Sequence, residues 1–150
     1  MATQQLGNSV LQVFSLIRLI DDGVRDQLAE SLPEGLNVSQ FHVMRLFDLK
    51  GDGLTPAEIA QTLHLPKSGV TSILQHLEAS GFVRIAPCPE DGRRKQAWIT
   101  PAGREIYHAA VTAIRPKMEK LREAFTLEEF QEALPFLRAL QTWFAQRDWA

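Results

Sequence analysis

The segment from Thr55 to Gly81 contains two helix starts separated by a very short connection, and this spacing most constrains the fold. Thr55-Pro56-Ala57-Glu58 supplies an N-cap residue, a proline at the first helical position and a glutamate at the third. The short helix that begins there ends near Leu63. His64-Leu65-Pro66 then leads directly into a second helix that runs to Gly81, a good C-terminal stop. The segment therefore predicts two consecutive helices joined by a tight turn.

Apolar and polar residues separate on the second of these helices. Its apolar side consists of Val70, Ile73, Leu74 and Leu77. The opposite side carries small or amide-bearing side chains that can approach base edges closely, with one basic residue and one imidazole at its flanks: Ser68, Thr71, Ser72, Gln75, Lys67 and His76. A solvated face normally carries Glu and Lys pairs, so this composition favours contact with a groove of nucleic acid. An ordinary solvated face is the alternative.

A basic hairpin follows this helix. Phe82–Ala86 and Gln96–Thr100 are rich in strand-favouring residues, and Pro87–Lys95 between them forms a long tip. Four basic residues (Arg84, Arg93, Arg94 and Lys95) and two acidic residues between positions 84 and 95 leave +2, whereas the whole chain carries -2. The order of helices and hairpin is that of a winged helix-turn-helix. Such a helix fits the major groove of duplex DNA, and arginines on a hairpin tip suit the narrow minor groove.

Helices precede and follow this region, so the expected fold is mainly α with a small β-hairpin wing. Asn37 and Gln40 form a capping box for a helix that runs to about Leu49. Thr100-Pro101 opens a fifth helix, which Pro116 is expected to kink or interrupt. A sixth helix begins with a capping box at Thr126–Glu129, and Pro135 is expected to bend it.

The first and last segments are unusually apolar. In the first, apolar residues recur at alternating steps of four and three, and others cover more of the circumference. A helix of this kind is either buried within its own fold or part of a dimer interface, and the pattern alone leaves both open. The last helix keeps the same spacing and is expected to pack against the first. If these segments form an interface, the residues that we expect in it are Leu6, Val10, Val13, Ile17, Ile20, Leu137, Leu140 and Phe144.

Composition limits the remaining classes of protein. With 45% hydrophobic and 23% charged residues, the 150-residue chain is typical of one soluble globular domain, and its net charge of -2 argues against a general polyanion binder. A single cysteine, Cys88, excludes an internal disulfide and a multi-cysteine zinc site. We expect a cytoplasmic protein without a signal peptide, a membrane span or a cofactor. The spacings assemble no catalytic constellation, so we expect no enzyme.

Several motifs together resemble the MarR family of bacterial transcriptional regulators. In the helical part they are Leu54–Ala60, Leu65–Thr71, Leu77-Glu78 and Gly81–Val83. Pro89–Arg94 looks like the family's Asp-x-Arg wing signature. Ile99–Gly103 is similar to its Leu-Thr-x-x-Gly helix start. The resemblance covers nearly the whole chain. It implies one domain, in which about 37–100 form the winged region, about 101–124 a connecting helix, and about 1–35 and 117–150 the dimerisation helices.

The resemblance also implies a homodimer that binds a pseudo-palindromic operator in double-stranded DNA. Asp91 would steady the wing, and Arg93 would enter the minor groove. Cys88 departs from the family pattern, because many members have an aspartate there, so the base of the wing would be held differently. The DNA-binding residues expected in total are Lys67, Ser68, Thr71, Ser72, Gln75, His76, Arg84, Asp91, Arg93, Arg94 and Lys95.

Family members commonly bind a small, often phenolic or anionic, effector in a crevice beside the dimer helices, which lowers DNA affinity. By this resemblance the chain would be a repressor released by a small molecule. Polar residues that could line the crevice are Arg18, His42, Arg45 and His108, although each also fits an ordinary solvated or packing role.

Two alternatives keep the same fold but change the signal that it senses. His42 and His108 could hold a metal ion, although their spacing is not that of a short ligand pair. Cys88 could act as a redox sensor, since a thiol near Arg84 and Arg93 would lose its proton more readily, but an inert wing cysteine is the simpler interpretation. A winged helix that binds only protein is a further alternative, and it would leave the basic wing without a role.

Overall fold

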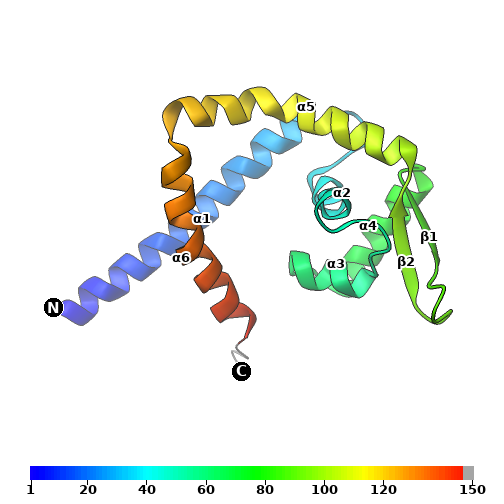
Figure 1. Cartoon of the computed structure of the whole chain (residues 1–150). Helices are drawn as coiled ribbons and strands as arrows, with labels where there is room; N and C mark the ends of the chain where they lie inside the picture. Colours follow the sequence, from blue (N-terminus) through cyan, green and yellow to red (C-terminus); the bar gives the residue numbers. More distant parts are fainter. Residues whose placement is uncertain (147–150) are drawn as a thin grey trace. The chain divides into compact units, whose positions relative to one another are not determined.

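The computed structural model describes residues 1–146, except for the side chains of residues 2, 3 and 6. Over these residues the chain is mainly helical, with six helices and a two-stranded antiparallel wing (Figure 1). The elements in order are α1 (Ala2–Ser31), α2 (Val38–Lys50), α3 (Pro56–Leu63), α4 (Lys67–Ala79), β1 (Val83–Pro87), β2 (Lys95–Ile99), α5 (Pro101–Ala124) and α6 (Leu127–Ala145). This is the fold class that the sequence predicts.

The contacts divide the chain into two compact units. One extends to Ile114 and the other begins at Arg115. The first unit contains α1 to α4, the wing and the beginning of α5, and the second contains the remainder of α5 and α6. Over the part of the chain that the structure describes, no helix is long and apolar enough to cross a membrane.

The helix starts follow the predicted caps. At α2, the side-chain oxygen of Asn37 accepts a hydrogen bond from the backbone N–H of Gln40 at 2.9 Å, and the Gln40 side chain accepts from the N–H of Asn37 at 2.9 Å. Thr55 and Glu58 make the same reciprocal pair at α3. Thr126 and Glu129 repeat it at α6. Each box satisfies backbone donors that the first turn of a helix leaves unpaired.

The connection between α3 and α4 is as short as the sequence predicts. His64 adopts the left-handed conformation (φ 51°, ψ 45°), and the N–H of Leu65 donates to the carbonyl of Ala60. Pro66 is the N-cap residue of α4. At the other end, α4 stops at Ala79, and Gly81 follows with φ 78°, a value that glycine adopts without strain.

The hydrophobic core lies in the first unit. Side chains that are essentially inaccessible come from α2, α3 and α4: Val43, Met44, Ile59, Val70, Leu74 and Leu77. Val83, Ala97 and Ile99 extend this core into the wing, and Tyr107, Ala110 and Ile114 of α5 complete it. The base of the wing is therefore packed into the same core as α4.

The wing pairs Val83 with Ile99 at its base and Pro87 with Lys95 near its tip. Both strands lie one residue away from the predicted ranges. Phe82 and Thr100, which were predicted in the strands, lie instead in the connections from α4 to β1 and from β2 to α5. The N–H of Phe82 donates to Leu77, and its carbonyl accepts from Thr100. Gly103 packs directly on this carbonyl, and a Cβ at position 103 would overlap with it. This contact explains why the start of α5 requires glycine there.

Both internal prolines lie within continuous helices. α5 continues through Pro116, and α6 continues through Pro135. The expectation that Pro116 interrupts the helix is therefore wrong. A proline removes one intrahelical hydrogen bond, but the residues after it, Lys-Met-Glu-Lys-Leu-Arg-Glu-Ala, are strong helix formers that maintain the helix on its far side.

Candidate nucleic-acid interface

The exposed face of α4 consists of the polar residues expected from the sequence. Lys67, Ser68, Thr71, Ser72, Gln75 and His76 are all exposed. Val70, Leu74 and Leu77 on the opposite face are at most 1% exposed, and Ile73 is half-buried. The structure thus confirms the separation of faces. A helix with this arrangement can lie in a groove without disturbing the packing behind it.

Two polar side chains on this face bond to their own helix. The Thr71 hydroxyl donates to the carbonyl of Lys67 at 2.9 Å. His76 Nδ1 lies 2.8 Å from the carbonyl oxygen of Ser72. Because a carbonyl oxygen only accepts, Nδ1 carries the proton, and Nε2 of a neutral ring is left as an acceptor. These local bonds reduce the freedom of the two side chains before any partner binds.

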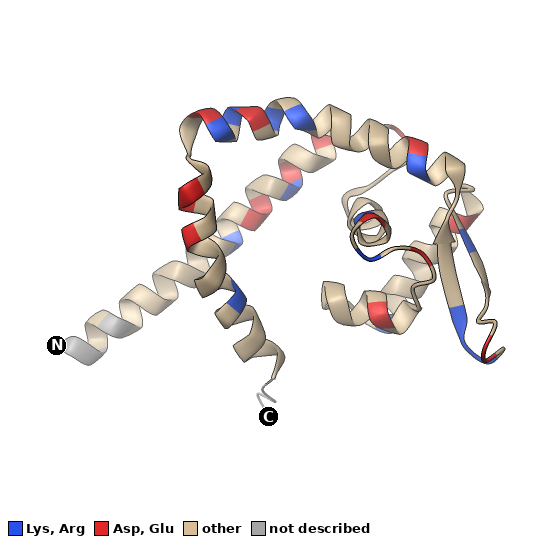
Figure 2. Ribbon diagram, viewed as in Figure 1, with Lys and Arg blue, Asp and Glu red and all other residues tan. Residues whose placement is uncertain are grey.

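The tip of the wing is closed by Asp91. Its carboxylate accepts a hydrogen bond from the N–H of Arg93 at 3.1 Å, and its carbonyl accepts from the N–H of Arg94 at 3.0 Å. An aspartate that bonds to the backbone two residues ahead forms a local turn. Arg93, Arg94 and Lys95 are exposed, and charged residues gather at this tip (Figure 2). The turn presents the basic side chains at the end of the hairpin.

Cys88 closes the hairpin through its backbone. Its N–H donates to the carbonyl of Arg94 at 2.6 Å, and its side chain is half-exposed. This closure does not depend on the side chain at position 88. The unusual residue type is therefore compatible with an ordinary wing.

Arg84 differs from the other basic residues of the wing. It lies opposite Trp98 near the base of the hairpin, and its guanidinium carbon is 4.7 Å from the centroid of the Trp98 ring. This distance is that of a cation–π contact. The structure places Arg84 away from the tip residues, and its part in DNA binding stays a prediction.

The first turn of α3 lies within electrostatic reach of the wing. Hydrogen bonds from the backbone and side chain of Thr55 lower the pKa of Glu58 below its ordinary value. The positive charges of Arg94 and Lys50 add smaller effects in the same direction. Glu58 therefore stays charged as a capping residue at neutral pH and partly offsets the positive potential beside α3.

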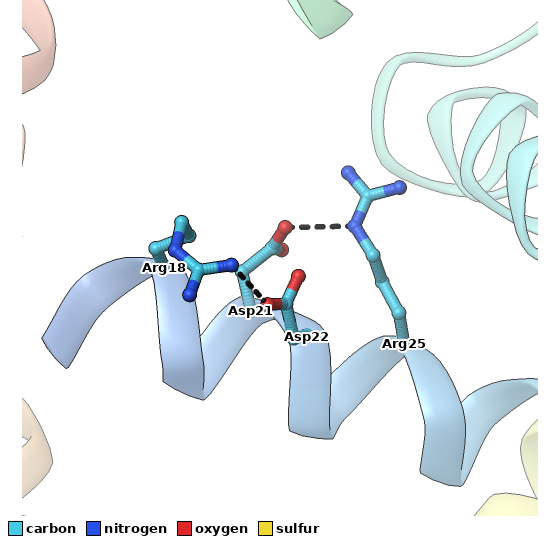
Figure 3. Close-up of polar contacts among 4 residues, drawn as sticks. All are labelled: Arg18, Asp21, Asp22 and Arg25. Carbon is cyan, nitrogen blue, oxygen red and sulfur yellow. Dashed lines mark hydrogen bonds and ion pairs between the residues drawn. The ribbon is translucent and has the colours of Figure 1, made fainter. Parts of the chain in front are cut away.

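The four residues proposed for effector binding occupy three helices. Arg18 of α1 forms an ion pair with Asp22 at 2.8 Å (Figure 3). His42 of α2 is half-buried, whereas Arg45 on the same helix is exposed. His108 of α5 is also exposed, beside the ring of Tyr107. Two cavities of about 360 and 370 Å³ are lined by other residues, so neither brings these four together.

The surroundings of His42 include a residue that the sequence analysis missed. Burial lowers the pKa of His42 most, and the positive charges of Arg25 and Arg45 lower it further, against an opposing effect of Asp21. Arg25 pairs with Asp21 at 2.7 Å (Figure 3). It lies seven residues after Arg18 and so on the same side of α1, which is the signal that could have identified it. Burial and the two positive charges therefore favour the neutral form of the imidazole.

Among the residues that the structure describes, no group of three or more His, Cys, Asp or Glu side chains could hold a metal ion. His42 and His108 therefore have no additional ligand of these types within that part of the chain. The metal-sensing alternative receives no support from this geometry.

Helices α1 and α6 expose apolar residues along much of their length. On α1, Val10, Ile17 and Ile20 are 47%, 37% and 63% exposed, and Val13 is half-buried. On α6, Leu137 and Phe144 are 42% and 41% exposed, and Leu140 is half-buried. The side chain of Leu6 lies outside the described residues. Large apolar side chains exposed along a helix in this way indicate an interaction surface on each of the two helices.

Comparison with known proteins begins with the central segment. Residues 34–94 match the sequence profile of the MarR family. The HTH-type transcriptional regulator PrsX of Escherichia coli is 33% identical over 82 residues, which are 53% of this chain and 49% of PrsX. The HTH-type transcriptional repressor YetL of Bacillus subtilis is 29% identical over 96 residues, 63% of this chain and 58% of YetL. The chain thus spans about half the length of these curated relatives.

Solved structures resemble a larger part of the chain. The MarR family transcription regulator SP03579 has a TM-score of 0.71 and 25% identity, and the match covers 95% of this chain and 92% of that one. A mutant MarR from E. coli, complexed with operator DNA, has a TM-score of 0.78 at 22% identity and covers 89% and 96%. PcaV from Streptomyces coelicolor, in complex with its natural ligand, has a TM-score of 0.73 at 16% identity and covers 85% and 89%.

The geometry and the similarities lead to the same conclusion. The matched profile covers α2 to α4 and most of the wing, which are the elements that carry the exposed polar face and the basic tip. The structural matches extend the similarity to most of the remaining chain. Residues 34–94 of this chain thus match the MarR family, and the chain has the winged helix-turn-helix fold of the solved MarR-like structures.

Proposed function

We propose that this chain regulates transcription by binding double-stranded DNA as a homodimer. The observation that carries the proposal is the combination, within one compact unit, of the polar face of α4 with a hairpin that ends in Arg93, Arg94 and Lys95. The major groove admits an α-helix, and its base edges present donors and acceptors that hydroxyl and amide side chains can match. The narrow minor groove attracts arginine.

The exposed apolar residues of α1 and α6 support the dimer. Burying apolar surface contributes roughly 25 cal/mol per Å², so a second copy of the chain is a favourable partner for these faces. Two copies related by a two-fold axis would present two α4 helices to successive major grooves. The operator is then a pseudo-palindrome with half-site centres about 34–36 Å apart. In this role the protein acts in the cytoplasm.

The regulator acts as a repressor that a small molecule releases from DNA. YetL is a repressor, and PcaV was solved with its natural ligand, so both properties occur among similar proteins. The surroundings of His42 support an anionic or phenolic effector, because the positive charges of Arg25 and Arg45 act on this half-buried imidazole, against a smaller opposing effect of Asp21. Arginine pairs well with carboxylates. Arg18 and His108 stay further candidates for this site.

The DNA-binding part is tested by selecting bound fragments from a genomic pool and footprinting the selected site. We expect protection of two half-sites one helical turn apart. If both α4 helices and both wings engage, about 6–10 phosphates are neutralised, and affinity falls by roughly 10³–10⁵ between 50 and 200 mM salt. Protection of one half-site, with a salt dependence corresponding to two or three phosphates, would contradict the two-winged dimer.

The effector part is tested on the protein–operator complex. Aromatic carboxylates and phenols are added as a panel, and release of labelled DNA is followed by fluorescence anisotropy. We expect at least one member to release the wild-type protein at concentrations that leave a variant with Arg25→Gln and Arg45→Gln bound. Equal release of both proteins would place the effector elsewhere, and metal ions or peroxide acting instead would favour the sensing alternatives.

A further inference from the structure

The wing has only two strands, so both of its edges carry backbone groups that β1 and β2 cannot pair with each other. The N–H of Cys88 pairs with Arg94 across the hairpin, and the N–H of Thr100 pairs with Phe82. Since pairing alternates along an antiparallel ladder, the odd-numbered residues of each strand direct their backbone groups outward. These outward groups need partners wherever water is excluded.

On the β1 edge, the outward N–H of Ile85 donates to the carboxylate of Glu78 at 3.1 Å. The next outward position is Pro87, which has no N–H. Glu78 belongs to α4 and follows Gln75 by three residues, so it lies on the same side of that helix. This hydrogen bond therefore connects the helix proposed to read bases with the strand that carries the wing.

On the β2 edge, the outward N–H of Ile99 donates to the carboxylate of Asp52 at 3.1 Å. The other carboxylate oxygen of Asp52 lies 2.8 Å from a guanidinium nitrogen of Arg104 in α5. Two residues before Ile99 on the same edge, the N–H of Ala97 donates to the carbonyl of Leu54 at 2.8 Å. One aspartate thus connects the α2–α3 loop to both β2 and α5.

Above its base, the wing borders a cavity of about 360 Å³ that residues of both α4 and β1 line. Glu78 and Ile85, which the hydrogen bond joins, are both among these lining residues. At the base, by contrast, Val83, Ala97 and Ile99 are buried in the core, so the wing stays folded without the carboxylates.

We propose that Glu78 and Asp52 are positioning residues that hold the wing, from its two edges, at a fixed angle to α4. This proposal rests on the proposed DNA-binding function. A five-residue strand is about 17 Å long, so a rotation of about 10° at its base moves the tip by about 3 Å. Such a shift removes Arg93 from contact distance in the minor groove while α4 occupies the major groove. The two carboxylates act through Arg93 and do not touch DNA themselves.

Paired variants separate the hydrogen bond from the charge. Glu78→Ala and Glu78→Gln both remove the negative charge, but only glutamine keeps a side-chain acceptor for Ile85. Asp52→Ala and Asp52→Asn form the same pair for Ile99, and both lose the ion pair with Arg104. We expect the alanine variants to bind the selected operator about five- to tenfold more weakly than their amide counterparts.

A double-mutant cycle with Arg93→Ala tests whether Glu78 affects DNA affinity through Arg93. If Glu78 acts by positioning the wing, Glu78→Ala weakens binding in the wild-type background and has little further effect once Arg93 is absent. Independent, multiplicative losses would overturn the proposal. Equal affinity of Glu78→Ala and Glu78→Gln would overturn it as well, since charge would then be the only property that matters.

A measurement without DNA separates this proposal from the proposed function. Amide hydrogen exchange of Ile85 should accelerate in Glu78→Ala and recover in Glu78→Gln, and Ile99 should respond in the same way to the two Asp52 variants. Unchanged exchange in the alanine variants would overturn the positioning role even if the wild-type protein binds its operator. Failure of the wild-type protein to bind any selected DNA would instead overturn the proposed function, and the role of the wing with it.

Discussion

Helix α4 exposes one face, whereas α1 is exposed around most of its circumference, and the exposed residues of the two helices are of opposite kinds. The exposed face of α4 carries hydroxyl and amide groups, whereas α1 exposes Val10, Leu11 and Ile20. Hydrated polar groups can exchange water for base edges at little cost, so α4 needs no partner to be stable in solution. Exposed aliphatic groups gain only by being covered. The comparison predicts a polar ligand for α4 and a protein partner for α1.

The two halves of α1 differ in the same way. Residues 2–17 contain no charged side chain, and the charged residues of the helix, Arg18, Asp21, Asp22, Arg25, Asp26 and Glu30, all lie in the second half (Figure 2). The ion pairs of this half are exposed (Figure 3). Exposed ion pairs of this kind contribute at most about 1 kcal/mol. We therefore expect the apolar half of α1 to provide most of the association energy.

Ile17→Asp should have the largest effect, because it places a charge on the face that we expect to be buried between two chains. An unpaired buried ion costs several kcal/mol, so the variant should be monomeric or unfolded at micromolar concentration. Light scattering after size-exclusion chromatography measures the mass. Ser15→Asp adds the same charge to the polar stripe of α1 and should remain dimeric. A stable Ile17→Asp dimer would show that this face is not the interface.

Leu74→Ala tests the buried face of α4, which is covered by the same chain. Leu74 is 1% exposed, so its truncation should lower the free energy of unfolding by about 2–5 kcal/mol. The dissociation constant of the dimer should not change. Ile20→Ala on the exposed face of α1 should instead raise that dissociation constant. Urea unfolding and sedimentation measure the two quantities, and the comparison fails if both variants change the same one.

Gln75→Ala and Arg93→Ala should separate base reading from general affinity. A bidentate amide contact to adenine contributes about 1–3 kcal/mol of discrimination, so Gln75→Ala should relax the preference at one position in each half-site. Arg93→Ala should weaken binding to all sequences, because a minor-groove arginine responds to groove shape and potential. Competition assays with specific and random DNA measure both effects. Equal losses on the two DNAs for Gln75→Ala would remove it from the base-reading face.

The smallest expected effect is on the pH dependence of stability. It involves His42 of α2 and the charge of Arg25 in the second half of α1. Burial and the charges of Arg25 and Arg45 lower the pKa of His42 from its ordinary value of 6.5. The unfolded chain therefore takes up the proton first, so stability is fully present above pH 6.5 and falls as the pH drops through the folded pKa. His42→Gln should flatten this part of the profile, measured by urea unfolding between pH 7.5 and 5. An unchanged slope would mean that other groups cause it.

Glu58 provides a second window at lower pH. Its folded pKa is lowered from 4.5 by the hydrogen bonds of Thr55, so its contribution is present above pH 4.5 and is lost as the pH falls through the lower folded value. Because the two windows do not coincide, a loss that begins near pH 6.5 cannot come from the cap of α3.

Much of the fold could be predicted from the sequence, because its signals are local. The capping boxes at Asn37, Thr55 and Thr126 each involve residues three apart, and the face of α4 follows from helical spacing. The strands begin and end one residue away from the predicted ranges, because Phe82 and Thr100 form the junctions with α4 and α5. Of the kink or interruption predicted at Pro116, the interruption is absent, because helix formers on its far side outweigh one lost hydrogen bond.

The features of the candidate site also divide into those that depend on sequence neighbours and those that depend on tertiary packing. The sequence by itself determined the exposed residues of α4, the basic tip of the wing and the turn at Asp91, because each depends on neighbours within a few positions. Only the tertiary structure placed the Arg84 guanidinium over Trp98 and seated His42 near Arg25. It also joined Asp52 to Ile99 and to Arg104, residues 47 and 52 positions away. Such contacts depend on how separate elements pack, and packing is a property of the whole core rather than of any local pattern.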